Sequence, residues 1–424
     1  MNFQESIDYL FGLGYELSVK KFGLENTYTL LEALGNPQNS FIKIQVAGTN
    51  GKGSTCAFLE SILVQAGIAV GVNTSPHLIS VTERVRKNGN DISEERFAKY
   101  VTKVRRISAE LVRQGKLQGM PTFFEHITCI AQLYFADEEV EVAILETGLG
   151  GRFDATTATE AEIVAITPIA LDHTKTLGDT IEKIALEKAA IIRGGVRAVI
   201  ADQNEAALEV ILSKCEEHEI KPTFTGSIKA EGSGDRLSFE TPVDTYKSVT
   251  LGLAGKHQVE NAKTAVLLAE TLRDFDFEIS TRDVETGLQL AVHKGRLEYA
   301  DGILYDGAHN VSGAKALREY LETSVDQPIT MVFAAMGGKD LSEMSSVLFP
   351  LTRHIVFTTP ENPRARPAQE TARFVSDHVK PKNVFVIDDV GKAFEKARDL
   401  SGGNGLILVT GSLYLIGEIK AYLQ

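Results

Sequence analysis

A glycine-rich segment near the N-terminus, "VAGTNGKGST", contains the residue types of a phosphate-binding loop. Lys52 and the hydroxyls of Ser54 and Thr55 follow a strand-like run that ends at Val46. Glycines let backbone N–H groups converge on an anion, and a helix N-terminus favours negative charge. The spacing differs from the usual P-loop, because Val46 stands where the first glycine belongs and a glycine separates Lys52 from Ser54. Three glycines in six residues nevertheless favour a phosphate loop over a tight turn with a solvated lysine.

Polar side chains also follow three other strand-like runs. Glu146 ends "VAILE", Ser75 follows "AVGVN" and His173 follows "EIVAIT". Ligands of open α/β sheets bind at the carboxyl ends of the strands, and Mg²⁺ prefers oxygen ligands. Together with Ser54, these side chains form a candidate magnesium site. A single histidine in such a place is more often a hydrogen-bonded structural residue, so the four groups carry weight only as a set.

One lysine of the segment "DTIEKIALEKAAIIR" lies on the apolar side of an expected helix. Asp179 is the expected N-cap, with Glu182 three residues further on. Lys188 is three, four or seven residues from each apolar residue of that side, namely Ile181, Ile184, Ala185, Ile191 and Ile192. A buried lysine needs a partner or a chemical modification, whereas a lysine at the edge of the face extends its ammonium into solvent. The spacing does not distinguish these alternatives.

A second cluster of polar residues occurs late in the chain. Asp306 ends the run "ILYD" and is followed by His309 and Asn310 before a helical pattern. Asp306 is expected either to accept hydrogen bonds from a ribose or to cap that helix. Arg296 lies near the expected domain boundary, where it either reaches nucleotide phosphates or forms an interdomain salt bridge.

Strand-like runs alternate with helical patterns, which predicts an α/β fold with mostly parallel sheets. In the first half the strands are expected at 41–46, 69–73, 142–146 and 162–167, and the helices at 54–66, 93–114 and 123–135. A turn-rich stretch over 225–251 predicts a small antiparallel appendage, and a helix follows at 258–272. Five more runs follow, which are "ILYD", "ITMVFA", "HIVFT", "VFVID" and "LILVT". We expect a P-loop-type parallel-sheet ATPase domain over 1–295 and a smaller Rossmann-like α/β domain over 296–424.

The bulk composition narrows the class of protein. A chain of 424 residues is long enough for two domains. Its net charge of −13 argues against a general nucleic-acid or membrane-surface binder. The three scattered cysteines form no CxxC pair, which indicates a reducing, cytoplasmic setting without a zinc site. We find no signal peptide and no apolar run long enough to span a membrane.

With these residues assembled, the chain resembles the folylpolyglutamate synthase/dihydrofolate synthase family, within the Mur ligase superfamily. The matching motifs occur in the family's order along nearly the whole chain: "GTNGKGST", "SPHL", "TERVR", "TGLGGRFDAT", "DHTKTLGDTIEKIALEKA", "GRLE", "DGAHN" and "TGSLYLIGE". The shortened loop with Lys-Gly-Ser is therefore this family's own form of the P-loop.

The resemblance implies roles for particular residues. ATP is expected to contact Asn50, Gly51, Lys52, Gly53, Ser54, Asn261, Arg296, Asp306 and His309, and Asn310 completes the motif "DGAHN". Two magnesium ions are expected, held by Ser54, Ser75, Glu146 and His173. Lys188 matches the lysine that carbon dioxide carbamylates in these ligases, and with Lys52 and His173 it is an expected catalytic residue. Phe124, Arg152 and Asp154 are the expected contacts of the pterin-bearing substrate.

The resemblance also implies the reaction, which is ATP-dependent amide formation between L-glutamate and a reduced folate or dihydropteroate through an acyl phosphate. The Arg152-Phe153-Asp154 loop is similar to that of bacterial bifunctional members, which favours both acceptors. Departures such as Lys175-Thr176 and Ala190 bear on substrate preference rather than on the reaction class. The alternatives are a cell-wall Mur ligase and a P-loop nucleotide switch without ligase chemistry. A monomer is expected.

Overall fold

The computed structural model describes residues 1–14, 23–233, 236–338, 341–375 and 379–424. These residues form two compact units whose segments alternate along the chain. The first unit consists of Met1–Ile169, Thr180–Gly252 and Glu260–Val292, and the second of Ala170–Asp179, Leu253–Val259 and His293–Gln424. Two short segments of the second unit thus precede residue 295. The expected division into domains at that residue stays a prediction.

The first unit is built on an eight-stranded sheet in the order β4-β3-β2-β5-β1-β6-β7-β8. The strands are β1 (Ile42–Ala47), β2 (Val70–Asn73), β3 (Val85–Lys87), β4 (Asn90–Asp91), β5 (Val142–Glu146), β6 (Ile163–Ile166), β7 (Arg197–Ile200) and β8 (Thr223–Phe224). Six of them run parallel, and β3 and β4 extend the sheet in antiparallel fashion. The four strands expected in the first half are confirmed as β1, β2, β5 and β6.

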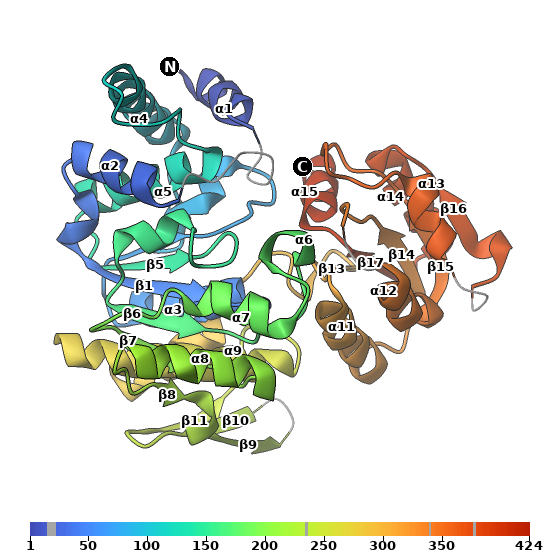
Figure 1. Ribbon diagram of the computed structural model, residues 1–424. Helices are drawn as coiled ribbons and strands as arrows, with labels where there is room; N and C mark the ends of the chain where they lie inside the picture. The colour runs from blue at the N-terminus through green and yellow to red at the C-terminus, as the bar shows by residue number, and fades with distance from the viewer. Residues whose placement is uncertain (15–22, 234–235, 339–340, 376–378) are drawn as a thin grey trace. The chain divides into compact units, whose positions relative to one another are not determined.

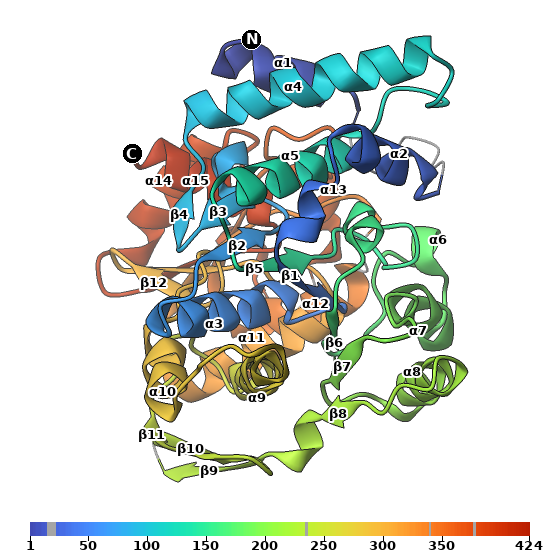
Figure 2. The same ribbon diagram turned by 90° about the vertical axis from the view of Figure 1, so that its left-hand side faces the viewer.

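Helices cover both faces of this sheet (Figure 1, Figure 2). On one face lie α4 (Glu94–Arg113) and α5 (Phe123–Asp137), and on the other lies α3 (Lys52–Gln65), against which α10 (Thr281–Leu290) packs. The other helices of this part are α1 (Phe3–Gly12), α2 (Glu25–Ala33), α7 (Ile181–Ala189), α8 (Glu205–Glu217) and α9 (His257–Leu272). The helices expected at 54–66, 93–114, 123–135 and 258–272 are confirmed, although α3 begins two residues earlier than expected, at Lys52.

The N-cap of α7 differs from the expectation. Thr180, not Asp179, has the extended backbone of a cap, and its hydroxyl accepts a hydrogen bond from the amide of Lys183 at 3.3 Å. Both residue types are good N-caps, so the sequence alone could not choose between them. The start of the helix moves by one residue, and the apolar face that contains Lys188 is unchanged.

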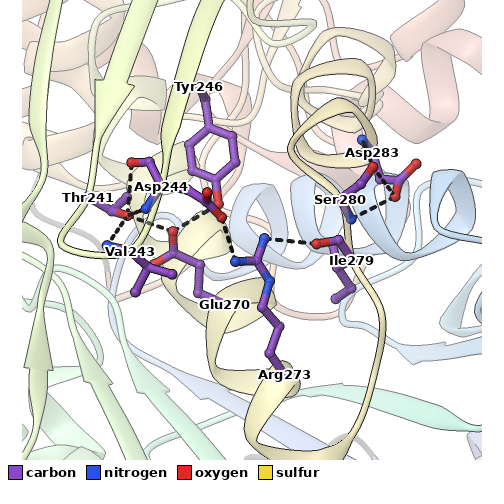
Figure 3. A network of polar contacts seen from close by, with 9 residues as sticks. All are labelled: Thr241, Val243, Asp244, Tyr246, Glu270, Arg273, Ile279, Ser280 and Asp283. Atoms are coloured by element: carbon purple, nitrogen blue, oxygen red, sulfur yellow. Dashed lines mark hydrogen bonds and ion pairs between the residues drawn. The ribbon is translucent and has the colours of Figure 1, made fainter.

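The expected antiparallel appendage is confirmed as the sheet β11-β10-β9, formed by β9 (Lys229–Ser233), β10 (Arg236–Glu240) and β11 (Thr245–Val249). A polar network joins it to the C-terminal end of α9 (Figure 3). The hydroxyls of Tyr246 and Thr241 donate to Glu270 Oε1 at 2.8 and 2.7 Å, and Arg273 pairs with Asp244 at 2.5 Å. Burial raises the pKa of the Glu270 carboxyl. The network ties the appendage to the same helix that carries Asn261 near its start.

The second unit contains a six-stranded sheet in the order β12-β13-β17-β14-β15-β16. Its strands are β12 (Glu298–Ala300), β13 (Ile303–Asp306), β14 (Ile329–Phe333), β15 (Thr352–Phe357), β16 (Val384–Val386) and β17 (Leu406–Thr410). Only β12 is antiparallel to its neighbour. The principal helices are α11 (Val311–Ser324), α12 (Leu341–Leu348), α14 (Val390–Ser401) and α15 (Leu413–Tyr422), with the short α6 (Thr174–Leu177) and α13 (Ala368–Thr371). The five expected strands and the Rossmann-like α/β character of this part are confirmed.

Candidate functional site

The phosphate loop connects the carboxyl end of β1 to the start of α3. Gly51 has φ +90° at the N-cap of α3, and a Cβ there would lie 2.2 Å from Asn261 Oδ1. A Cβ on Gly48 would lie 1.8 Å from Thr167 Oγ1. Both glycines therefore allow the loop to pass closer to its neighbours than any other residue permits. The structure brings Asn261, an expected ATP contact, directly against this loop.

The backbone amides of the loop divide into two groups. Those of Thr49 and Asn50 donate to Pro168 O at 3.1 and 3.2 Å. The first helical hydrogen bond of α3 runs from Thr55 N to Gly51 O at 2.8 Å, so the amides of residues 52–54 precede the helical ladder. The Asn50 amide is thus bonded within the protein, and the contacts of the loop with phosphate stay a prediction.

Two lysines converge on one carbonyl oxygen of the phosphate loop. Lys52 Nζ lies 3.2 Å from Gly48 O and 3.3 Å from Thr49 O. Lys188 Nζ donates to the same Gly48 O at 2.5 Å, and this side chain is only 5% exposed. The ammonium is not extended into solvent, so the alternative of a lysine at the edge of the apolar face is wrong. Two like charges beside one carbonyl make this a place where an anionic group would be stabilised.

Glu146 and Ser75 also lie together, as expected from the strand ends. Glu146 is the last residue of β5, is buried, and pairs in register with Val46 of β1. Its Oε2 accepts a hydrogen bond from the amide of Ser75 at 3.1 Å, and Ser75 follows β2, the strand that pairs with β5. The structure therefore brings these two predicted metal ligands to one edge of the sheet, next to the strand that leads into the phosphate loop.

Oxygen donors dominate this edge. Within the described ranges, no group of three or more His, Cys, Asp or Glu side chains is arranged to hold a metal ion. Magnesium does not need such a group, because it keeps several waters and is commonly held by one or two carboxylates with substrate phosphates. Glu146 supplies one carboxylate, and the buried hydroxyls of Thr55 and Thr147 have no hydrogen-bond partner among the described residues. The donor set fits magnesium.

His173 belongs to the second unit, where Asp172 connects it to the late polar cluster. The Asp172 carboxylate accepts a hydrogen bond from the His173 amide at 2.8 Å and from Asn310 Nδ2 at 3.2 Å. It also lies 3.5 Å from His309 Nε2. Asp172 was missed by sequence reasoning, although it is adjacent to His173 in the motif "LDHT".

The turn after β13 is organised by Asp306. Its two carboxylate oxygens accept hydrogen bonds from Leu297 N at 3.0 Å and Ala308 N at 2.9 Å. Burial raises the pKa of this carboxyl, and the nearby Arg296 opposes that shift. The alternative that Asp306 caps α11 is wrong, because Asn310 does so by accepting from the amide of Gly313 at 2.8 Å.

Arg296 lies beside the same turn. Its Nη1 donates to Gly307 O at 3.2 Å. A guanidinium and a carboxylate thus flank the residues that lead to His309, and Arg296, Asp306, His309 and Asn310 form one cluster within the second unit.

Two of the predicted substrate residues, Arg152 and Asp154, belong to the loop that follows β5, and the third, Phe124, belongs to α5. Asp154 is 2% exposed, and its Oδ2 accepts hydrogen bonds from Gly148 N and Leu149 N at 2.8 and 2.9 Å. The Phe124 ring packs so closely on Gly148 that a Cβ there would lie 2.9 Å from it. The loop is therefore closed on itself by Asp154 and covered by Phe124.

Arg152 fastens the same loop to the end of α7. Its backbone amide donates to Glu187 O and its Nε to Glu187 Oε1, both at 2.9 Å. A Cβ on Gly151 would lie 2.8 Å from the carbonyl oxygens of Glu187 and Lys188. The loop is thereby packed against the turn of helix that contains Lys188.

Comparison with known proteins gives a consistent result. Residues 46–269 match the Mur ligase middle domain, and residues 295–413 match the Mur ligase glutamate ligase domain. The chain is 37% identical to a protein of Bacillus subtilis (strain 168) named dihydrofolate synthase/folylpolyglutamate synthase, over 95% of each chain.

Solved structures agree with these matches. The chain superposes on E. coli FolC in complex with DHPP and ADP with a TM-score of 0.88 at 28% identity, over 100% of this chain and 98% of that one. It superposes on a bifunctional folylpolyglutamate synthase/dihydrofolate synthase with Mn, AMPPNP and L-glutamate bound with a TM-score of 0.86 at 28% identity, over the same shares. No helix in the described part of the chain has the length and apolar character needed to cross a bilayer.

Proposed function

The chain belongs to the dihydrofolate synthase/folylpolyglutamate synthase family of Mur ligases, and we propose that it catalyses both reactions of that name at one site. It is an ATP-dependent ligase that forms an amide bond to L-glutamate. The acceptors are dihydropteroate, which yields dihydrofolate, and reduced folates, which gain a further glutamate. The observation that carries the function is the convergence of Lys52 and Lys188 on Gly48 O, in a loop at the edge of the sheet.

The reaction has two steps. A carboxylate of the acceptor attacks the γ-phosphorus of ATP, which releases ADP and leaves an acyl phosphate. The amine of L-glutamate then attacks the acyl carbon, loses a proton, and displaces phosphate. Phosphoryl transfer depends mainly on positioning and on neutralising charge. Lys52 and the first amides of α3 hold the phosphates, and Asn261 fixes the loop from the side of α9.

We assign Lys188 to carbamylation. The neutral amine attacks carbon dioxide, a C–N bond forms, and a proton leaves, so that the side chain ends in a carboxylate. This change removes one of two ammonium groups that face Gly48 O and places an anion beside Lys52. The burial of Lys188 supports the assignment, because an unmodified charge there is costly.

Ser54, Ser75, Glu146 and the carbamate of Lys188 would hold magnesium, and His173 a second ion. When bound, magnesium neutralises charge on the phosphates. In the second unit, Arg296, Asp306 and His309 are the proposed nucleotide contacts. Their clustering with Asn310 around one turn supports a common role.

The acceptor site is assigned to the loop after β5. The Phe124 ring is proposed to stack on the pterin. The guanidinium of Arg152, which stays partly exposed beside Glu187, is proposed to donate hydrogen bonds to the acceptor. Asp154 shapes the loop rather than touching the acceptor, because its oxygens already accept hydrogen bonds from the loop backbone. We further propose a cytoplasmic monomer that binds neither nucleic acid nor membranes, which the net charge of −13 and the three free, buried cysteines support.

Competition between the two acceptors tests whether one site serves both. We expect dihydropteroate and a reduced folate each to be glutamylated with Mg-ATP, as identified by product mass. Each should inhibit glutamylation of the other competitively, since they occupy one site. If reduced folates were glutamylated and dihydropteroate were not, the proposed dihydrofolate synthase activity would be wrong. Non-competitive inhibition would contradict the single site.

A further inference from the structure

The carboxylate of Asp172 contacts groups of three residues that have roles in the proposed function or belong to the proposed nucleotide site, namely His173, Asn310 and His309. Its Oδ1 accepts from the amide of His173 at 2.8 Å, and its Oδ2 accepts from Asn310 Nδ2 at 3.2 Å. The same Oδ2 lies 3.5 Å from His309 Nε2. The Asp172 side chain is 8% exposed, whereas the side chain of His309 is 27% exposed.

The contacts fix the orientation of two side chains. His309 Nδ1 lies 2.8 Å from Gly307 O, and because a carbonyl only accepts, Nδ1 carries the hydrogen. The Asp172 carboxylate faces the opposite nitrogen, and it holds the ring from that side in the imidazolium form, in which Nε2 carries a hydrogen as well. Asn310 is held similarly, because its Oδ1 accepts from Gly313 N and its Nδ2 donates to Asp172. Asp172 therefore helps decide which way each side chain faces.

Asp172 also holds the backbone of His173. This residue adopts φ +50°, a left-handed conformation that is uncommon outside glycine and in which asparagine, aspartate and histidine are enriched. The hydrogen bond from the His173 amide to the preceding carboxylate lies at this left-handed residue. One carboxylate thus joins the segment that carries His173 to the turn at 307–310.

We propose that Asp172 is a positioning residue that sets the orientation of His309 and Asn310 together with the path of the chain through His173. This role rests on the proposed function, since His173 and His309 matter to turnover only in a ligase of this kind. Carboxylates that orient metal-ligating histidines lower metal affinity or activity by about 10–100-fold when they are removed, and we take the same range for Asp172. We expect Asp172→Ala to lower kcat by about that factor, while the KM for the pterin acceptor changes little, because Phe124 and Arg152 are not among the groups that Asp172 is proposed to orient.

A double-mutant cycle separates positioning from a general loss of structure. Because Asp172 acts in part through His309, Asp172→Asn should lower kcat by a smaller factor in a His309→Gln background than in the wild type. Asp172→Asn keeps the size and one acceptor oxygen, so it decides the question even if Asp172→Ala unfolds. Asp399→Ala, on the exposed face of α14, is the control for loss of one acidic charge. Additive losses in the cycle, or unchanged kcat in Asp172→Asn and Asp172→Ala, would overturn the proposal.

A measurement on the imidazole itself does not depend on turnover. In ¹H–¹⁵N spectra of the full chain, Asp172→Asn should shift the ring signals of His309 and leave those of the buried His126 unchanged. Unshifted His309 signals would reject the positioning role. If the wild type releases no ADP, the proposed function fails, and these signals still decide whether Asp172 orients His309.

Discussion

Replacing Asp154 by asparagine would put an amide NH2 where backbone donors now meet a carboxylate oxygen. Oδ2 accepts from Gly148 N and Leu149 N at 2.8 and 2.9 Å, and Oδ1 accepts from Thr156 N at 3.1 Å and Thr156 Oγ1 at 2.6 Å. Whichever oxygen is replaced, at least one backbone N–H then faces another donor. The residue is 2% exposed, so water cannot easily take over.

The magnitude follows from these contacts. A hydrogen bond to a charged group contributes about 1.5–3 kcal/mol, and a buried donor left without a partner costs about 1–3 kcal/mol. The arrangement that loses least gives up the Thr156 N contact and weakens the others by removing the charge. We therefore expect Asp154→Asn to lower the free energy of unfolding by about 3 kcal/mol. The KM for the pterin acceptor should rise, because this loop also carries Arg152 and supports Phe124.

Urea unfolding and steady-state glutamylation test this expectation on the same preparations, with Asp399→Asn as a matched control on the surface of α14. The KM for ATP should change less than the KM for the acceptor. An unfolding free energy equal to that of the wild type, combined with lost turnover, would contradict the structural role of Asp154. Asp154 would then act on the substrate and not on the loop.

Three further changes test other parts of the site and core. Lys52→Ala should reduce ADP formation by about a hundredfold to a thousandfold in a folded protein, and near-normal turnover would remove its phosphate role. Lys188→Ala should cripple turnover, with partial rescue by short carboxylic acids such as acetate; full activity without added acid would contradict carbamylation. Burial lowers the pKa of His126 from 6.5 to about 4. Its neutral form is therefore favoured on folding, and the free energy of unfolding should fall by about 3 kcal/mol as pH drops from 6.5 towards 4. Urea unfolding across that range should show a shallower dependence in His126→Gln, and an identical one would contradict the shift.

The parts of the site that follow strand ends could be predicted from the sequence. Glu146 and Ser75 come directly after apolar runs, and parallel strands bring their carboxyl ends to one edge. The glycines of the phosphate loop could also be predicted from the sequence. Only the structure shows that Gly51 makes room for Asn261, which lies 210 positions later in the chain.

Other features depended on contacts between distant segments. Spacing placed Lys188 on an apolar face but could not show that Gly48 O would lie beside its ammonium. Nothing in the sequence indicated that Asp172 has a role of its own, because its partners His309 and Asn310 lie more than a hundred residues later in the chain. Periodicity reports which side of an element is buried, and it carries no information about which segment will cover that side.

The folate ligase activity is tested first by measuring ADP release with Mg-ATP and L-glutamate, compared without acceptor, with dihydropteroate and with a reduced folate. We expect ADP only when a pterin acceptor is present, in equal amount to a product that has gained one glutamate. ADP formed without any acceptor, or none formed with either one, would contradict a folate ligase and with it the assignments of Phe124 and Arg152.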